Sequence, residues 1–157
     1  KTGTYETCDE ALVITLSNIT PSAGYQFGKI TQSGINTDVT IDQENKKVTY
    51  AQNTSGTSTI NVTFNALPTH TVTWKVNGTE YNAGSPTTQV YDGGKVTTLP
   101  TAPDPNNYCG QVFAGWTTIP IEGTTSTKPS VLFTTVEDSP YITEPTPFYA
   151  VFADYAD

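Results

Sequence analysis

The stretch Tyr91–Val96, YDGGKV, places two glycines before a lysine, as in a fragment of a phosphate-binding loop. Such a loop needs a longer glycine-spaced turn and then Lys-Ser/Thr opening a helix. Here Lys95 is followed by VTTLP, a β-branched run that ends at Pro100, so no helix can begin. Asp-Gly-Gly between two β-type segments instead indicates a hairpin turn with positive φ angles. We therefore expect a turn, with Lys95 pointing to water at the start of the returning strand, and no nucleotide site.

His70 is the only histidine, so a Ser-His-Asp triad or a two-histidine metal site would have to be built around it. It lies two residues after Pro68 with a threonine on each side, a setting typical of a linker. We expect a solvated side chain without a catalytic or metal-binding role.

Neighbouring carboxylates need separate consideration, because a pair of them can hydrolyse a glycosidic bond. The chain has three such pairs: Asp9 with Glu10, Asp42 with Glu44, and Glu137 with Asp138. All three lie at expected turns or element ends, without the apolar surroundings that raise the pKa of a catalytic acid. Solvated turn carboxylates explain them more simply, and there is no D-x-D-x-D-G calcium loop. We expect no catalytic residue, metal or cofactor.

Nine tyrosines supply a further candidate, a platform of rings on which sugars could stack. Several lie near expected turns: Tyr81, Tyr91, Tyr108 and Tyr141. Cross-strand pairing and core filling are the competing explanation. The sequence leaves both open.

Charge and composition exclude some partners. The 157 residues carry a net charge of −8 and contain no arginine, and the lysines are scattered. Nucleic acids and anionic membrane surfaces require clustered basic residues, so we expect neither partner. No apolar run reaches the length of a membrane span. The acidic, threonine-rich composition is typical of exported proteins, so we expect an extracellular or cell-surface location, with any signal or anchor outside this segment.

Two cysteines, Cys8 and Cys109, are too few for a metal cage. In an exported protein they could form a disulfide, and otherwise they are buried thiols. The sequence does not decide between these states.

Alternating apolar residues recur along the chain and predict half-buried strands. The segments concerned are ALVITLS (11–17), TDVTID (37–42), KKVTYA (46–51), TINVTF (59–64), TVTWKV (71–76) and PFYAVF (147–152). Short turn-forming clusters separate them, as in antiparallel sheets. We therefore expect a mainly β protein.

The stretch NALPTH (65–70) is the best domain boundary, because Pro68 has no amide hydrogen for a sheet between two strong strands. It predicts a domain at 1–67 and another at 68–157. In the first, KKVTYAQNTSGTSTINVTF (46–64) resembles the closing hairpin of a small immunoglobulin-like β-sandwich module.

Four motifs follow one another in the second half of the chain. They are TVTWKVNG (71–78), YDGGKVTTLP (91–100), FAGW (113–116) and FYAVF (148–152), with a further proline at position 103. In this order they resemble the internalin-type B repeat, also called the Listeria–Bacteroides repeat, a β-grasp-like module of bacterial surface proteins. The resemblance covers residues of about 70 to 153, and the long Thr-, Ser- and Pro-rich stretch 117–147 departs from it.

The aromatic residues of these motifs are expected to form one core. It would contain Trp74, Phe113, Trp116, Phe148 and Phe152 under a threonine-rich outer face. Gly115 would let another backbone or ring approach closely.

The resemblance implies a non-enzymatic module of a cell-surface or secreted bacterial protein. Such a module acts in adhesion or as a spacer, with an extracellular protein or host glycan as partner. The alternatives are an accessory carbohydrate-binding module of a glycan-utilisation system and, less favoured, a hydrolase. Adhesive surfaces carry no short sequence signature, so no ligand-binding residue is assigned.

Overall fold

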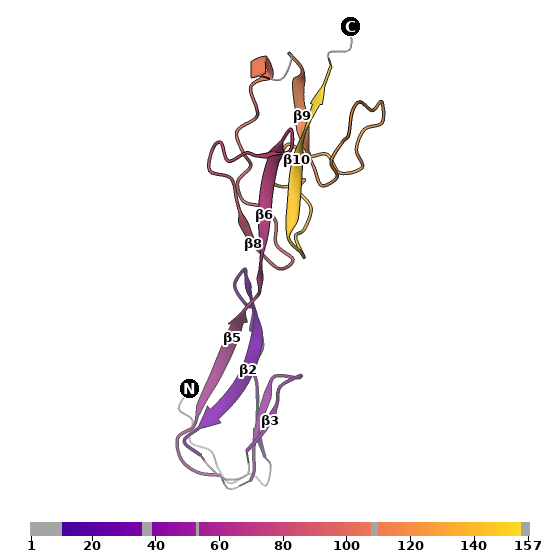
Figure 1. The fold of residues 1–157 in the computed structure, drawn as a ribbon. Helices are drawn as coiled ribbons and strands as arrows, with labels where there is room; N and C mark the ends of the chain where they lie inside the picture. Colours follow the sequence, from indigo (N-terminus) through magenta and orange to yellow (C-terminus); the bar gives the residue numbers. More distant parts are fainter. Residues whose placement is uncertain (1–10, 36–38, 53, 108–109, 155–157) are drawn as a thin grey trace. The chain divides into compact units, whose positions relative to one another are not determined.

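The computed structural model describes residues 11–35, 39–52, 54–107 and 110–154 (Figure 1). Cys8, Cys109, Tyr108 and the pair Asp9 and Glu10 lie outside the described residues. The described chain is mainly β, which confirms the predicted fold class, and its one helix is the short 3₁₀ turn η1 (Pro105–Asn107).

The chain divides into two compact units, Lys1–Ala66 and Leu67–Asp157, which we call unit 1 and unit 2. The division falls inside the stretch NALPTH. That the units fold as independent domains stays a prediction.

The strands described in unit 1 form two sheets. They are β1 (Leu12–Thr15), β2 (Tyr25–Ser33), β3 (Val39–Asp42), β4 (Lys47–Tyr50) and β5 (Thr59–Ala66). β4 pairs antiparallel with β1 and β3, and β2 pairs antiparallel with β5. Side chains from both sheets pack around Ile30, Val48 and Tyr50, so unit 1 is a small sandwich-like structure.

The hairpin expected at 46–64 is wrong. β4 and β5 are both strands, but they lie in different sheets and do not pair with each other. Alternation shows that each segment has an inner and an outer face, but it does not identify the partner strand.

β2 contains a bulge that interrupts the alternation of its apolar residues, so the sequence pattern did not predict this strand. Its register with β5 shifts between Phe27 and Lys29, which leaves Gly28 as an extra residue. A Cβ atom on Gly28 would lie 2.9 Å from Thr63 O, so a glycine suits this close approach. The shift lets Phe27 and Ile30, three residues apart, both pack in the core of unit 1.

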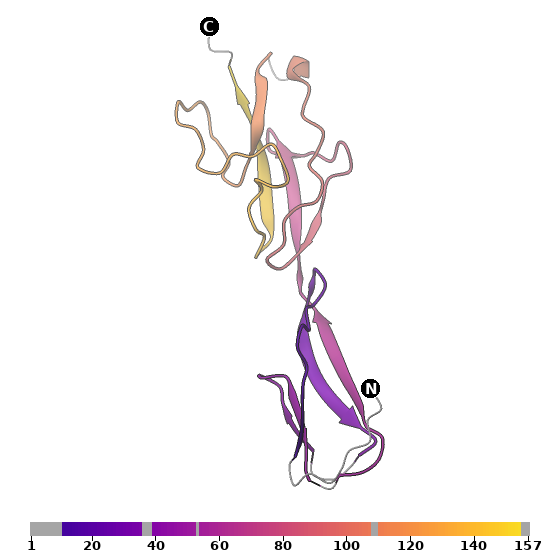
Figure 2. The ribbon, with the colours of Figure 1, turned by 180° about the vertical axis from the view of Figure 1, so that it is seen from behind.

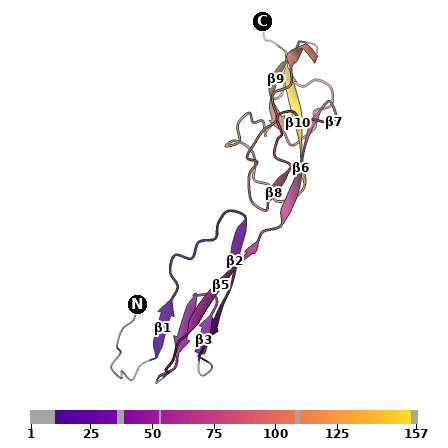
Figure 3. The ribbon, with the colours of Figure 1, turned by 90° about the vertical axis from the view of Figure 1, so that its left-hand side faces the viewer.

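Unit 2 is built on one mixed sheet. Its strands are β6 (Thr69–Val76), β7 (Thr79–Glu80), β8 (Gln89–Tyr91), β9 (Val112–Thr117) and β10 (Thr146–Ala153). Their order is β7-β6-β10-β9, and β8 also pairs with β6. β6 and β10 are parallel neighbours, whereas the other strand pairs are antiparallel (Figures 1 and 3).

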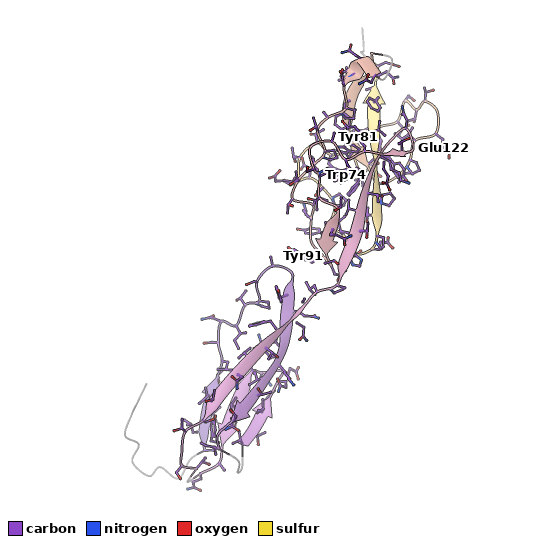
Figure 4. The ribbon with its side chains drawn as sticks, turned by 60° about the vertical axis from the view of Figure 1, so that its left-hand side comes forward. Trp74, Tyr81, Tyr91 and Glu122 are labelled. Carbon is purple, nitrogen blue, oxygen red and sulfur yellow. The ribbon has the colours of Figure 1, made fainter. Side chains whose placement is uncertain are left out.

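The expected aromatic core of unit 2 is confirmed. Trp74, Trp116 and Phe148 are at most 1% exposed, and Phe113 and Phe152 pack against them. The Trp74 and Trp116 rings meet edge to face, with centroids 5.0 Å apart. Figure 4 shows Trp74 inside unit 2, between the sheet and the surrounding loops.

The connection between β9 and β10, which Figure 2 shows as a long loop, adds two more core residues. It brings Phe133 and Ile142 into the core, each through an isolated antiparallel bridge. Trp116 N–H donates to Phe133 O at 2.9 Å, beside Gly115. A Cβ atom on Gly115 would lie 2.8 Å from that oxygen, which confirms the expected close approach of a backbone.

Candidate functional site

A groove of about 730 Å³ lies between the loop 121–132 and the ends of β9 and β10. Such a volume is within the range of small-molecule sites. The groove draws on four separate parts of unit 2, because the turn after β6, the start of β9, the loop and the end of β10 all contribute.

The lining of the groove combines hydroxyl and amide groups with an apolar patch. The side chains of residues 124–127 supply hydroxyls, and Asn77 and Gln111 supply amides. Ile121, Leu132 and Val151 supply the apolar part. This mixture suits a ligand that has many hydroxyl groups and some C–H surface, such as a sugar chain.

One polar pair in the groove is held in place by a direct bond. Gln111 Nε2 donates to Asp154 Oδ1 at 2.8 Å, and this bond links the residue before β9 to the residue after β10. This bond leaves the Gln111 amide oxygen and the second Asp154 oxygen as acceptors for ligand hydroxyls.

The loop over the groove is anchored at both ends by contacts with β9. Phe133 N–H donates to Trp116 O at 3.0 Å, and Leu132 lies against Gly115. At the other end, Ile119 N–H donates to Thr117 Oγ1 at 3.4 Å. The projecting part carries Glu122, which Figure 4 shows away from the core.

His70 does not lie in a solvated linker, so that expectation is wrong. It belongs to β6, and its side chain is 17% exposed. Its Nε2 lies 2.9 Å from Asp92 Oδ1, and Asp92 N–H donates to Pro68 O at 2.8 Å. The pair therefore ties the turn after β8 to the start of β6.

The stretch YDGGKV contains the expected turn but not the expected hairpin. Gly94 N–H donates to Tyr91 O at 2.8 Å, and Gly93 has a φ of +73°. After the turn, Gly94 pairs with Ile142 of the β9–β10 connection. Residues 95–104 contain no helix whose N-terminus could bind a phosphate.

Lys95 is engaged by neighbouring residues, contrary to the expectation that it points to water. Its ammonium lies 4.8 Å from the ring centroid of Tyr141 and donates to the carbonyl oxygen of Glu137. The side chain therefore joins the turn to the β9–β10 connection.

In each of the two described carboxylate pairs, the aspartate accepts hydrogen bonds within its own turn. Asp42 accepts from Asn45 N–H at 2.9 Å and from the Asn45 side-chain amide at 2.8 Å. The backbone N–H of Asn45 is the main reason that the pKa of Asp42 lies below its ordinary value. Asp138 accepts from Thr135 Oγ1 at 2.9 Å. Glu44 and Glu137 are exposed.

The tyrosines divide between core and surface. Tyr81 packs against Trp116 with ring centroids 6.3 Å apart. Tyr91 and Tyr141 are 37% and 71% exposed, and Figure 4 shows Tyr91 at the periphery of unit 2. Lys95 covers one face of Tyr141, so that ring can offer its other face alone to a ligand.

Two negative findings apply to the described residues alone. Within them, no three His, Cys, Asp or Glu side chains are placed to hold a metal ion together. Nor is any helix there long and apolar enough to cross a membrane.

No family model matches the chain, and neither does any curated protein or any solved structure. The likeness of residues 70–153 to the B repeat therefore stays a prediction.

Proposed function

We propose that this chain is a non-enzymatic module of a bacterial cell-surface or secreted protein that acts in adhesion or as a spacer. Its partner is an extracellular protein or a host glycan. Unit 2 is the B-repeat-like, β-grasp-like part, and unit 1 is a small sandwich-like part that precedes it in the chain.

The observation that carries this proposal is the convergence of the sequence motifs in unit 2. TVTWKV forms β6, FAGW lies in β9 and FYAVF lies in β10. Trp74, Trp116 and Phe148 from these three motifs meet in one core, and YDGGKV closes a turn beside it. Motifs that resemble a family only by their order in the sequence therefore also belong to one structural unit.

The central strand pair of unit 2 is consistent with a β-grasp-like module. The first and last strands, β6 and β10, are parallel neighbours in a mixed sheet. The core is completed by Val96, Phe133 and Ile142, which lie in loops instead of a helix.

The side chains with catalytic potential support a non-enzymatic role because they make structural bonds. The His70–Asp92 pair fastens a turn, Asp42 caps a turn, and Lys95 bridges two loops. A catalytic acid or base instead needs a pKa matched to its task and access to substrate.

The location and the lack of turnover can be tested together. Brief protease treatment of intact cells that make the protein should release peptides from this chain. Extracellular matrix proteins and mucin glycans incubated with the purified chain should be recovered uncleaved. Recovery of the chain only from the cytosol, or cleavage that is lost in Glu137→Gln, would contradict the proposal.

The groove favours a second candidate function, an accessory carbohydrate-binding module. Its hydroxyl and amide lining beside Ile121, Leu132 and Val151 can contact both the hydroxyls and the C–H faces of a sugar chain.

A test of this second candidate uses neutral hexose oligosaccharides and isothermal calorimetry. Gln111→Ala removes an amide from the groove and should weaken binding of any oligosaccharide that the wild-type chain takes. Gln89→Ala is the matched control, because Gln89 is an exposed amide on β8 that bonds Thr71 away from the lining. Equal affinity of the two variants, or no binding at all, rejects the groove as a sugar site.

A further inference from the structure

The first and last strands of unit 2 lie directly beside each other and run in the same direction. Their register pairs Val72 with Thr146, Trp74 with Phe148, and Lys75 with Tyr149. The chain therefore enters unit 2 at one end of this parallel pair and leaves it at the opposite end.

Backbone hydrogen bonds on the other side of β6 show which of its residues face β10. Val72 N–H donates to Thr88 O at 2.9 Å, and Trp74 O accepts from Tyr81 N–H at 2.8 Å, so both residues use the side away from β10. Backbone groups of successive strand residues point to opposite sides, which leaves Thr73 and Lys75 to bond β10.

Pro147 does not weaken this pairing, although it has no amide hydrogen. It lies opposite Thr73, and in a parallel pair a bonding residue reaches the two neighbours of its opposite residue. Thr73 thus bonds Thr146 and Phe148, while the missing amide of Pro147 would have pointed away from β6.

We propose that the β6–β10 pair is a mechanical clamp that lets unit 2 carry tension along the chain. Tension applied at the start of β6 and the end of β10 pulls the two strands past each other in opposite directions. The interstrand hydrogen bonds lie across this force and are loaded together, so they must break in one step. A pair pulled apart from one end instead breaks bond by bond, at lower force.

Side-chain contacts brace the clamp on both faces of the sheet. On the core face, the rings of Trp74 and Phe148 lie 4.8 Å apart between centroids, and the two residues are opposite each other in the register. On the other face, Lys75 Nζ lies 5.9 Å from the ring centroid of its opposite residue, Tyr149. Sliding of the strands would break both contacts along with the hydrogen bonds.

Unit 1 is connected differently. Its first described strand, β1, pairs with β4, and its last, β5, pairs with β2 in the other sheet. No hydrogen-bonded pair among its described strands joins the two that receive the tension. Unit 1 should therefore yield first.

The inference rests on the proposed function only in assuming that the chain is held at both ends. A weak clamp would overturn the inference and leave an adhesive role intact. Cleavage of a partner or a cytosolic location would overturn the proposed function and leave the clamp intact.

The test is single-molecule stretching of the full chain through handles at its two termini. A reductant keeps Cys8 and Cys109 from forming a bond. Unfolding of 12–66 releases up to about 190 Å of chain, and unfolding of 69–153 releases up to about 290 Å, so the two events can be told apart. We expect the longer step at the higher force. A longer step at equal or lower force overturns the clamp.

A change of pulling direction tests the mechanism on the same fold. Handles attached through azide-bearing residues at positions 69 and 144, both exposed, pull β6 and β10 from the same end. We expect a several-fold lower force than with terminal handles. An unchanged force shows that the pair is not loaded as proposed.

A matched pair of variants tests the brace. Tyr149→Ala removes a ring contacted by lysine inside the clamp, and Tyr141→Ala removes such a ring outside it. With terminal handles, Tyr149→Ala should lower the unfolding force of unit 2 and Tyr141→Ala should not. Equal forces for the two variants contradict the brace.

Discussion

At the scale of single residues, the two tryptophans determine what unit 2 can be. Trp74 and Trp116 are each 1% exposed, and Trp74 Nε1 donates to Thr87 O at 2.8 Å. A buried indole with its N–H bonded is a core residue and offers no face to a ligand. Sequence alternation predicted the burial of Trp74, which lies between Val72 and Val76 on one strand face. The burial of Trp116 was expected from the FAGW motif.

Replacement of Trp116 by alanine should destabilise unit 2 strongly. The ring contacts Trp74, Phe113 and Tyr81, so its removal leaves a cavity that these side chains cannot fill. We expect a loss of about 3–5 kcal/mol in the free energy of unfolding, measured in urea by Trp74 fluorescence. A loss below about 1 kcal/mol would place the ring outside the core.

Gly115→Ala should also destabilise unit 2, through the backbone. Gly115 has a φ of +142°, and the added Cβ atom would lie 2.8 Å from Phe133 O. The control is Gly123→Ala, where φ is +73° and nothing lies within 4 Å. Both variants place an alanine at positive φ, which costs of order 1–3 kcal/mol. The larger urea-midpoint shift expected for Gly115→Ala reflects the close approach together with its less accessible φ. Equal shifts would show that Phe133 moves away without cost.

At the scale of elements, the sequence patterns predicted where most strands lie but not which strands pair with each other. Alternation marked β1, β3, β4, β5, β6 and β10. β2 was missed because the bulge at Gly28 breaks its period. The hairpin at 46–64 was wrong because two adjacent alternating segments can belong to opposite sheets. Partner choice depends on long-range packing, which a local pattern does not contain.

The stability that Asp42 gives to the turn between β3 and β4 should decrease as the pH is lowered. Hydrogen bonds from Asn45 lower the pKa of Asp42 in the folded chain, so ionised Asp42 stabilises folding at pH values above the ordinary carboxyl pKa of about 3.9. This contribution is lost as the pH falls through the folded pKa. The stability difference between wild type and Asp42→Ala, from urea melts at pH 6 and pH 2.5, should therefore narrow in acid. A difference that stays constant would mean that the charge of Asp42 does not matter.

At the scale of the whole molecule, the two units differ in how much core they bury. Among the described residues, the core of unit 1 has three buried hydrophobic side chains and the core of unit 2 has nine. Stability rises with the apolar area that folding removes from water. Unit 1 is therefore expected to be the less stable part.

Denaturation can show this difference because both tryptophans are in unit 2. In a urea titration, circular dichroism should report an early loss of β structure from unit 1, before tryptophan fluorescence changes. Hydrogen exchange of β2 amides, such as that of Ile30, should be faster than exchange in β6. Coincident transitions by both probes would show that the chain unfolds as one cooperative unit.

The groove illustrates what sequence alone does not supply at this scale. Its lining comes from Asn77, Gln111, the loop 121–132 and the end of β10, which are far apart along the chain. In the sequence, each of these segments has the pattern of an ordinary turn, strand end or polar loop. The parallel pairing of β6 with β10, the antiparallel pairing of β9 with β10 and the bridge from Trp116 to Phe133 bring them together.

The central position of β10 also has a consequence for how the protein is made. β10 is the last strand of unit 2, yet it supplies the backbone partner of β6 on one side and of β9 on the other. During synthesis from the N-terminus, β6 and β9 cannot pair with β10 until β10 has been made. Contacts between segments so far apart in the sequence also form slowly. The sheet of unit 2 therefore stays incomplete until the residues of β10 have been synthesised.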